Sequence, residues 1–106
     1  MNLTNIRRGC LEGCILEMIR KEPTHSYHIY MQLKNQGVLK ITPQSVYTIT
    51  SRLEAKGLVK STYVYSSIGP NRKLLSICEK GDQELVLFKE LWQETTEHIN
   101  AILQAG

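Results

Sequence analysis

Long hydrophobic runs are absent from this chain of 106 residues, and no segment approaches the roughly 20 apolar residues that a membrane-spanning helix needs. The N-terminal region places two arginines before an apolar stretch, but Glu12 and Glu17 interrupt that stretch, so it does not resemble a secretory signal. Hydrophobic residues make up 42% of the chain and charged residues 22%, which is typical of a folded globular domain. We therefore expect a single cytoplasmic domain with no membrane partner.

Cysteine is also scarce, and the three cysteines do not form a recognisable framework. Cys10 and Cys14 are four residues apart on a predicted helix, Cys78 is isolated, and no C-x-x-C spacing occurs. This pattern favours reduced thiols over disulfides. His25 and His28 are three residues apart, but no Cys, Asp or Glu completes a metal-binding set near them. We expect neither a metal nor a cofactor.

Catalytic motifs are missing as well. The sequence contains no spaced set of nucleophile, base and acid, and no glycine-rich loop that would hold a phosphate. The third histidine, His98, has no spaced partner either. An enzyme is therefore not expected, and a binding function is favoured.

Acidic residues are few in the first two-thirds of the chain. Residues 1–73 hold 11 Lys and Arg against 4 Glu, a net charge of +7, whereas residues 74–106 hold 2 Lys against 6 acidic residues, a net charge of −4. The two parts sum to the overall charge of +3. A basic front fits a surface that faces a polyanion, although chance clustering of surface charge would give the same totals.

The segment from Thr42 to Leu58 has signals for both ends of a helix. Thr42 is a good N-cap, Pro43 suits the first helical position, and Gly57 suits the left-handed residue after the end. At 100° per residue, one face is predicted to enter the core and the opposite face to be polar and uncharged. The inward set is Val46, Ile49, Thr50 and Leu53, and the outward set is Gln44, Thr48, Ser51 and Ala55, flanked by Ser45, Tyr47 and Arg52.

A basic hairpin is predicted directly after this helix. Two strand-like runs, 59–66 and 73–77, are joined by a turn that contains Gly-Pro-Asn-Arg. A capped polar helix followed by such a hairpin is typical of a winged helix-turn-helix, in which the helix enters the DNA major groove and the wing reaches phosphates or the minor groove.

Two further helices are predicted before the capped helix and its hairpin, and one helix is predicted after them. They cover about 4–21, 24–35 with Thr24 as its cap, and 79–104; residues 38–41 are expected to pair with the hairpin as a third strand. The predicted fold is mainly α with a small antiparallel β wing: a winged helix-turn-helix over residues 1–78 and a long C-terminal dimerisation helix over 79–106, which form one compact unit.

The last helix carries an apolar seam with alternating spacings of three and four, the pattern by which two helices pack along their length. A helix of about 26 residues spans roughly 39 Å, more than the small domain needs for its own core. We therefore predict a homodimer, the alternative being that this face lies on its own domain. The seam is Leu85, Phe88, Trp92, Thr95, Ile99 and Ile102.

With these elements placed, the sequence resembles the PadR family of bacterial transcriptional regulators along nearly its whole length. The resemblance rests on six short motifs in order, and it implies the compact subgroup that ends in a single dimerisation helix. The motifs are Thr24-His-Ser-Tyr-His-Ile29, Thr42-Pro-Gln-Ser-Val-Tyr47, Arg52-Leu-Glu-Ala-Lys-Gly-Leu-Val59, Gly69-Pro-Asn-Arg-Lys73, Ile77-Cys-Glu-Lys-Gly81 and the Leu11-Glu12/Ile15-Leu16 spacing.

The sequence departs from the family pattern in three places. Ser26 stands where the family usually has Gly, and Leu74 and Leu75 stand where the wing often has Tyr. Cys78 replaces a capping Thr, so the last helix is expected to begin less firmly, by about 1 kcal/mol.

The function predicted from these features is that of a repressor that binds an inverted repeat in double-stranded DNA as a homodimer. Gln44, Ser45 and Thr48 are expected to contact base edges, and Arg72 is the candidate for minor-groove insertion. The remaining predicted DNA-binding residues are expected to contact phosphates or to supply positive charge. Tyr27 and Tyr47 could instead be packing residues, and Arg52 could pair with Glu54 or another neighbour. The remaining set is His25, Tyr27, Tyr47, Arg52, Asn71 and Lys73.

Trp92, the only tryptophan, falls in the middle of the seam and is either a large core residue or part of a ligand site. In the second interpretation, Trp92 and the same residue of the second subunit stack on a planar aromatic effector. The family resemblance supports this interpretation. Leu11, Ile15 and Phe88 would complete the pocket, with Glu12 or Glu94 as a counter-charge. A rival function is a winged-helix protein-interaction module, which would require an apolar outer face on the third helix and no basic wing.

Overall fold

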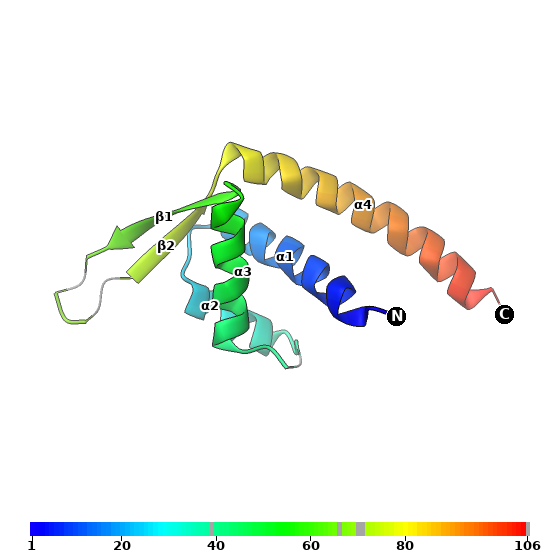
Figure 1. The fold of residues 1–106 in the computed structure, drawn as a ribbon, viewed down its shortest axis with the longest axis horizontal. Coiled ribbons are helices and arrows are strands. Elements are labelled where there is room, and N and C mark those ends of the chain that lie inside the picture. The colour runs from blue at the N-terminus through cyan, green and yellow to red at the C-terminus, as the bar shows by residue number, and fades with distance from the viewer. Residues whose placement is uncertain (39, 66, 70–71, 106) are drawn as a thin grey trace.

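A computed structural model describes residues 1–38, 40–65, 67–69 and 72–105. Four helices accompany a two-stranded antiparallel sheet that projects from one side of them, and the last helix extends far beyond the rest on the other side (Figure 1). This arrangement confirms the predicted fold class. In chain order the elements are α1 (Leu3–Lys21), α2 (Ser26–Asn35), α3 (Pro43–Ala55), β1 (Val59–Val64), β2 (Arg72–Ile77) and α4 (Glu79–Gln104).

Local capping signals determine where α3 begins and ends. The Thr42 hydroxyl accepts a hydrogen bond from the Ser45 backbone N–H at 3.0 Å, and the Ser45 hydroxyl accepts one from the Thr42 N–H at 3.1 Å. These reciprocal bonds form a capping box, which satisfies two backbone donors at the start of the helix. At the other end Gly57 has a φ of 76°, in the left-handed region that glycine adopts without strain.

The start of α4 lacks such a cap. Cys78 occupies the N-cap position and makes no side-chain capping bond, as its replacement of a capping threonine predicts. Glu79 and Asp82 lie in the first turn, where their charges interact favourably with the helix dipole.

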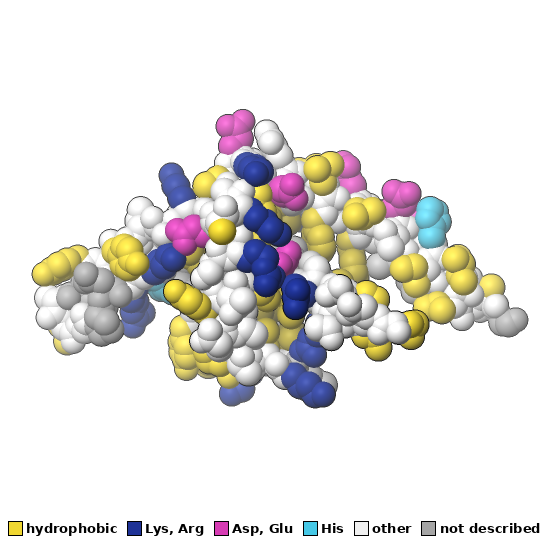
Figure 2. All heavy atoms as spheres, in the orientation of Figure 1, with side chains coloured by type: hydrophobic (Ala, Val, Ile, Leu, Met, Phe, Trp, Pro, Cys, Tyr) yellow, Lys and Arg dark blue, Asp and Glu magenta, His cyan; other side chains and the backbone are white. Residues whose placement is uncertain are grey.

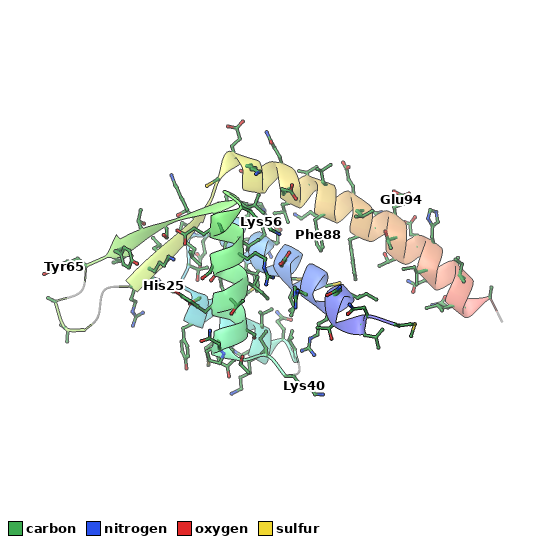
Figure 3. All side chains as sticks on the ribbon, viewed as in Figure 1. His25, Lys40, Lys56, Tyr65, Phe88 and Glu94 are labelled. Atoms are coloured by element: carbon green, nitrogen blue, oxygen red, sulfur yellow. The ribbon has the colours of Figure 1, made fainter. Side chains whose placement is uncertain are left out.

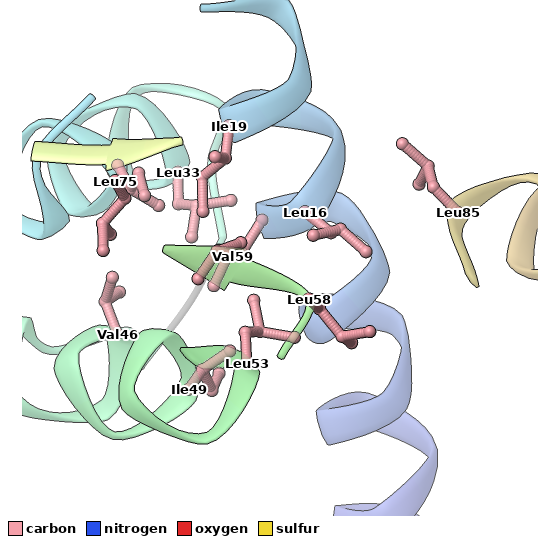
Figure 4. Packing of buried hydrophobic residues seen from close by; sticks show 12 residues of the cluster. Leu16, Ile19, Leu33, Val46, Ile49, Leu53, Leu58, Val59, Leu75 and Leu85 are labelled. Carbon is pink, nitrogen blue, oxygen red and sulfur yellow. The ribbon is translucent and has the colours of Figure 1, made fainter. Parts of the chain in front are cut away.

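The hydrophobic core lies where α1, α2, α3 and the base of the hairpin meet (Figure 4). Helix α3 contributes the four inward residues that its sequence predicts, all of them buried. Ile15 and Ile29 are completely buried, and Leu85 brings the first turns of α4 into the same cluster. The buried hydrophobic set is Ile15, Leu16, Ile19, Ile29, Leu33, Val46, Ile49, Leu53, Leu58, Val59, Leu75 and Leu85.

The strands pair from Val59 opposite Ile77 at the base to Val64 opposite Arg72 near the tip. The segment that pairs with the hairpin differs from the one predicted, and it forms an isolated bridge instead of a third strand. Thr24 forms two backbone hydrogen bonds with Leu75, at 3.1 and 2.8 Å, whereas the described part of 38–41 forms no strand. Thr24 is therefore used by the sheet, and α2 begins with His25 as N-cap and no side-chain capping bond.

Two glycines bring the base of α4 close to its neighbours. A Cβ atom at Gly81 would lie 2.1 Å from the Leu58 carbonyl oxygen, and one at Gly13 would lie 2.3 Å from the Phe88 ring. Only glycine permits these approaches, so they fix the base of α4 against α1 and the start of β1. Beyond this base, α4 runs outward to form one end of a molecule 60 Å long (Figure 1). Over the described parts of the chain, no helix combines the length and apolar character that crossing a membrane requires.

Candidate nucleic-acid interface

The outward face of α3 is polar, uncharged and accessible. Gln44, Tyr47 and Thr48 are exposed and Ser51 is partly exposed, while the opposite face is buried in the core. The Thr48 hydroxyl donates to the Gln44 carbonyl at 3.0 Å, which fixes its rotamer against the helix. Within the described residues the Gln44 amide makes no hydrogen bond, so its donor and acceptor remain available to another polar surface.

The Ser45 hydroxyl is already hydrogen-bonded at the start of α3. Its hydroxyl donates to the Thr42 carbonyl at 2.8 Å while it accepts from the Thr42 N–H. These two bonds use the hydroxyl within the capping box. Ser45 therefore holds the start of α3, and a base contact from it would have to compete with this cap.

Arg52 is engaged with α1. Its Nη1 lies 2.7 Å from Glu12 Oε1, and Lys56 Nζ lies 3.9 Å from the other Glu12 oxygen. The partner is thus Glu12, 40 residues away in sequence, rather than Glu54. This ion pair fastens α3 to α1, and Glu12 also lines a groove together with Phe88 of the α4 seam.

Lys73 braces the wing against α3. Its Nζ lies 2.7 Å from Glu54 Oε1, and the Ser61 hydroxyl donates to the other Glu54 oxygen. The hydrogen bond from Lys73, helped by that from Ser61, lowers the pKa of Glu54, and Glu54 in turn raises the pKa of Lys73. Because α3, β1 and β2 each contribute one group, this cluster fixes the angle between the helix and the wing.

His25 connects the start of α2 to the same strand. Its Nδ1 lies 3.1 Å from the Lys73 carbonyl oxygen and donates to it, since a carbonyl can only accept (Figure 3). Within the described residues, the other ring nitrogen makes no hydrogen bond. Tyr27, two residues later, is 63% exposed, so its hydroxyl is accessible.

The wing itself presents two different faces. Since Tyr63 pairs with Lys73 and Val64 with Arg72, Lys73 lies on the face toward α3 and the exposed Arg72 on the opposite face. Asn71, also a predicted contact, lies outside the described residues. Figure 2 shows Lys and Arg side chains gathered over α3 and its surroundings, while most Asp and Glu lie along α4.

Sequence reasoning missed the aromatic character of the wing. Tyr63 of β1 is 71% exposed and lies on the side that carries Ser61, and Tyr65, directly after the end of β1, is 85% exposed. Tyr47 of α3 and Tyr63 both lie near enough to Lys73 to contribute to its raised pKa. The signal was present in the alternation of Ser61 and Tyr63, which places both side chains on one face of the strand, with Tyr65 following at the next alternate position of the sequence.

The seam of α4 divides into a covered part and an open part. Leu85 is only 2% exposed because it packs into the core of its own chain, so its assignment to a dimer interface is wrong. Phe88 is half-buried and points toward α1 (Figure 3). From Trp92 onward the seam is open: Trp92 is 50% exposed, Thr95 is exposed, and Ile99 and Ile102 are 46% and 73% exposed.

The open part is wider than the seam alone. Leu87, Leu91 and Leu103 on α4 are each at least 60% exposed. Leu3 and Ile6, at the start of α1, are exposed to a similar extent. Together these residues form a long apolar surface at the end of the molecule away from the wing.

The predicted ligand residues do not form one pocket in the single chain. Ile15 is completely buried and is not accessible as an open lining, which corrects that assignment, whereas Leu11 is only partly buried and stays a prediction. Phe88 and Trp92 do meet, with nearly parallel rings whose centroids are 6.4 Å apart. Phe88 also lines two grooves of about 770 and 380 Å³ on either side of its contact with Gly13, and Trp92 lines neither. Glu94 is exposed on α4 (Figure 3).

Comparison with known proteins gives a consistent match. The sequence profile described as the transcriptional regulator PadR-like family matches residues 15–86, from α1 into α4. An uncharacterised protein of Lysinibacillus sphaericus is 27% identical over 103 residues, which cover 95% of this chain and 94% of that protein.

Solved structures resemble the whole chain. A PadR-like transcriptional regulator from Bacillus cereus is 33% identical with a TM-score of 0.83, and the match covers 94% of this chain and 97% of that one. A PadR-like transcription factor from Bacteroides fragilis is 30% identical with the same TM-score, covering 96% and 99%. A PadR family regulator from Eggerthella lenta, 24% identical with a TM-score of 0.86 over 98% and 90%, shares the fold.

Proposed function

Because the chain belongs to the PadR-like family of transcriptional regulators, we propose that it is a cytoplasmic repressor that binds an inverted-repeat operator as a homodimer. The observation that carries this proposal is the outward face of α3. It is polar and uncharged, it is held rigid by a capping box, and it stands beside a basic wing. A rigid helix of this kind fits the major groove of B-DNA, which is about 12 Å wide.

Base recognition is assigned to the first turns of α3. The uncommitted Gln44 amide matches the adjacent donor and acceptor that adenine presents in the major groove. Thr48 follows one turn later on the same face, and its methyl group and hydroxyl suit a thymine methyl or a base edge. Ser45 acts mainly through the cap, which positions Gln44.

Phosphate contacts are assigned to groups around this face. The exposed hydroxyls of Tyr27 and Tyr47 can donate to phosphate oxygens, and His25 is assigned to the same backbone through its second ring nitrogen. Arg52 remains paired with Glu12 and contributes a phosphate contact only through its other guanidinium nitrogens. At the wing, Arg72 supplies accessible positive charge beside Asn71, whereas Lys73 mainly braces the wing.

The dimer is assigned to the open apolar surface of α4. Trp92, Ile99 and Ile102 lie on this surface with Thr95, and Leu91 and Leu103 widen it. Large contiguous apolar surfaces are uncommon on monomers and mark interaction sites. A twofold axis through this surface would present two copies of α3 to half-sites about 34 Å apart.

Release from DNA is assigned to a planar aromatic effector held between the subunits. The nearly parallel rings of Phe88 and Trp92, with Trp92 half exposed, offer an aromatic wall to such a molecule. The effector would change DNA affinity by binding one angle between the subunits better than another. Its second wall would come from the partner, because Ile15 is completely buried and Leu11 is only partly exposed.

A mobility-shift titration tests the proposal. The probe is a duplex with the sequence upstream of the protein's own gene, compared with an unrelated duplex of equal length at several salt concentrations. We expect a complex of two chains per duplex that forms preferentially on the first probe. Its affinity should fall steeply as salt rises, since each neutralised phosphate releases counterions. Equal binding to both probes, or none, would contradict the proposal.

A further inference from the structure

The end of the wing carries more exposed apolar surface than a charge-based DNA contact requires. Ile68 is 97% exposed, Tyr65, which directly follows β1, is 85% exposed, and Tyr63 of β1 is 71% exposed. Figure 2 shows hydrophobic side chains at this end of the molecule, and Figure 3 places Tyr65 there. A single exposed apolar residue needs no explanation, but three large ones within six residues, far from any core, indicate a contact surface.

This surface is continuous with the proposed DNA-binding face. Tyr63 lies opposite Lys73 in the hairpin, and Lys73 reaches Glu54 of α3. Tyr47 of α3 lies near Lys73 as well. An exposed aromatic side chain of the wing, Tyr63, and one of α3, Tyr47, therefore both lie near Lys73, and a duplex held on α3 would meet this side of the wing.

The charge of the hairpin favours a polyanion over other partners. Residues 59–77 contain Lys60, Arg72 and Lys73 and no acidic residue. The six residues of β1 span about 20 Å, at roughly 3.3 Å each. This length is sufficient to carry the tip past one phosphate backbone, from a helix in the major groove to the neighbouring minor groove, which is about 6 Å wide.

From these observations we propose that the wing tip enters the minor groove as an apolar wedge, in which Ile68 presses between two base pairs and bends the operator. The proposal rests on the proposed function. Side chains such as Ile, Leu and Phe unstack base steps in this way and kink DNA by 20–90°. Tyr63 and Tyr65 lie along the groove wall, where their rings contact sugars and their hydroxyls reach phosphates. Arg72, on the other face of the wing, neutralises phosphates beside the kink.

The wedge gives the protein a source of specificity apart from the contacts of α3. Pyrimidine–purine steps are the most easily unstacked, so an operator with TA or CA at the wedge position should bind more tightly than one with a stiff A-tract there. The aliphatic side chain of Ile68 cannot form a hydrogen bond with a base. The preference would therefore depend on how flexible the base-pair step is, and not on hydrogen bonds to particular bases.

DNA bending provides the test. A duplex with the sequence upstream of the gene is labelled at both ends with a fluorescence energy-transfer pair, and its bend is measured in the complex with the wild-type dimer, with Ile68→Ser and with Ile68→Leu. The matched control is Val86→Ser, which removes a 56% exposed apolar side chain from α4, away from the wing.

We expect the wild type, Ile68→Leu and Val86→Ser to bend the duplex by at least about 20°. Ile68→Ser should leave the duplex nearly straight and bind it about tenfold more weakly, because a buried apolar contact is lost. A straight duplex in a specific wild-type complex, or full bending by Ile68→Ser, would overturn the wedge and leave the repressor proposal intact. The absence of any specific complex would overturn both.

Discussion

Replacing Leu85 or Leu91 by alanine should distinguish the role of the buried part of α4 from that of its exposed part. The same change is made at two positions of one helix that have opposite surroundings. Leu85 is 2% exposed and belongs to the core, whereas Leu91 is 63% exposed in the single chain. The first change therefore removes contacts within a chain. The second removes only contacts that a partner would make.

The expected magnitudes follow from burial. Truncating a buried leucine to alanine costs about 2–5 kcal/mol, so Leu85→Ala should lower the melting temperature by at least about 10 °C in a domain of this size. Leu91→Ala should change the unfolding free energy of the monomer by no more than about 0.5 kcal/mol. A twofold interface loses two leucine side chains at once, each contributing about 1.5–3 kcal/mol, so the dimer dissociation constant should rise about 100-fold or more.

Urea unfolding at two protein concentrations and sedimentation equilibrium measure these quantities separately. For the wild type and Leu85→Ala, the unfolding midpoint should depend on protein concentration, since dissociation is linked to unfolding. For Leu91→Ala this dependence should weaken. The reasoning is refuted if Leu91→Ala destabilises the monomer as much as Leu85→Ala does, or if it leaves the dimer unchanged.

Three further predictions concern contacts within the chain. Glu54→Gln removes the charge that pairs with Lys73 and so loosens the cluster that fixes the angle between α3 and the wing. DNA affinity should therefore fall, while the midpoint of thermal unfolding stays within a few degrees. A binding isotherm measures the first quantity and a melting curve the second. The pKa of Glu17 is lowered to about 2, first by its hydrogen bond to Arg20 and then by its hydrogen bond to Lys89. The stabilising effect of the Glu17 carboxylate is therefore fully present above about pH 4.5 and is lost as the pH falls toward 2. Unfolding free energies measured over this range should fall less steeply for Glu17→Gln than for the wild type. Gly13→Ala places a Cβ atom 2.3 Å from the Phe88 ring and should cost about 1–3 kcal/mol in a denaturation experiment, and adding Phe88→Leu should recover part of that loss.

The sequence was sufficient to predict the elements whose ends depend on local signals. The capping box at Thr42, the left-handed Gly57 and the period of the apolar residues in α3 all act within one or two turns. For this reason the inward and outward faces of α3 agree with the prediction. The start of α4 agrees as well, because the absence of a side-chain cap at Cys78 depends only on the residue at that position.

Features that depend on contacts between distant segments were not predictable in the same way. Thr24 looks like a helix cap, but its backbone pairs with Leu75, about 50 residues later. Arg52 finds Glu12 rather than the nearby Glu54 because packing brings α1 beside α3. The seam of α4 shows the same limit: a 3-4 alternation identifies the apolar face, but it does not say that the chain's own core covers Leu85 and leaves Trp92 open.

The central claim is that the outward face of α3 reads bases, and the most direct test is a set of affinities for altered operators. Wild type and Gln44→Ala are each titrated with the operator and with versions that carry one symmetric base-pair change in both half-sites. We predict that Gln44→Ala loses discrimination at one base pair per half-site, with a change of about 1–3 kcal/mol at that position, and keeps the wild-type pattern elsewhere. If Gln44→Ala keeps the full wild-type pattern at every position, the account of how this protein recognises DNA is contradicted.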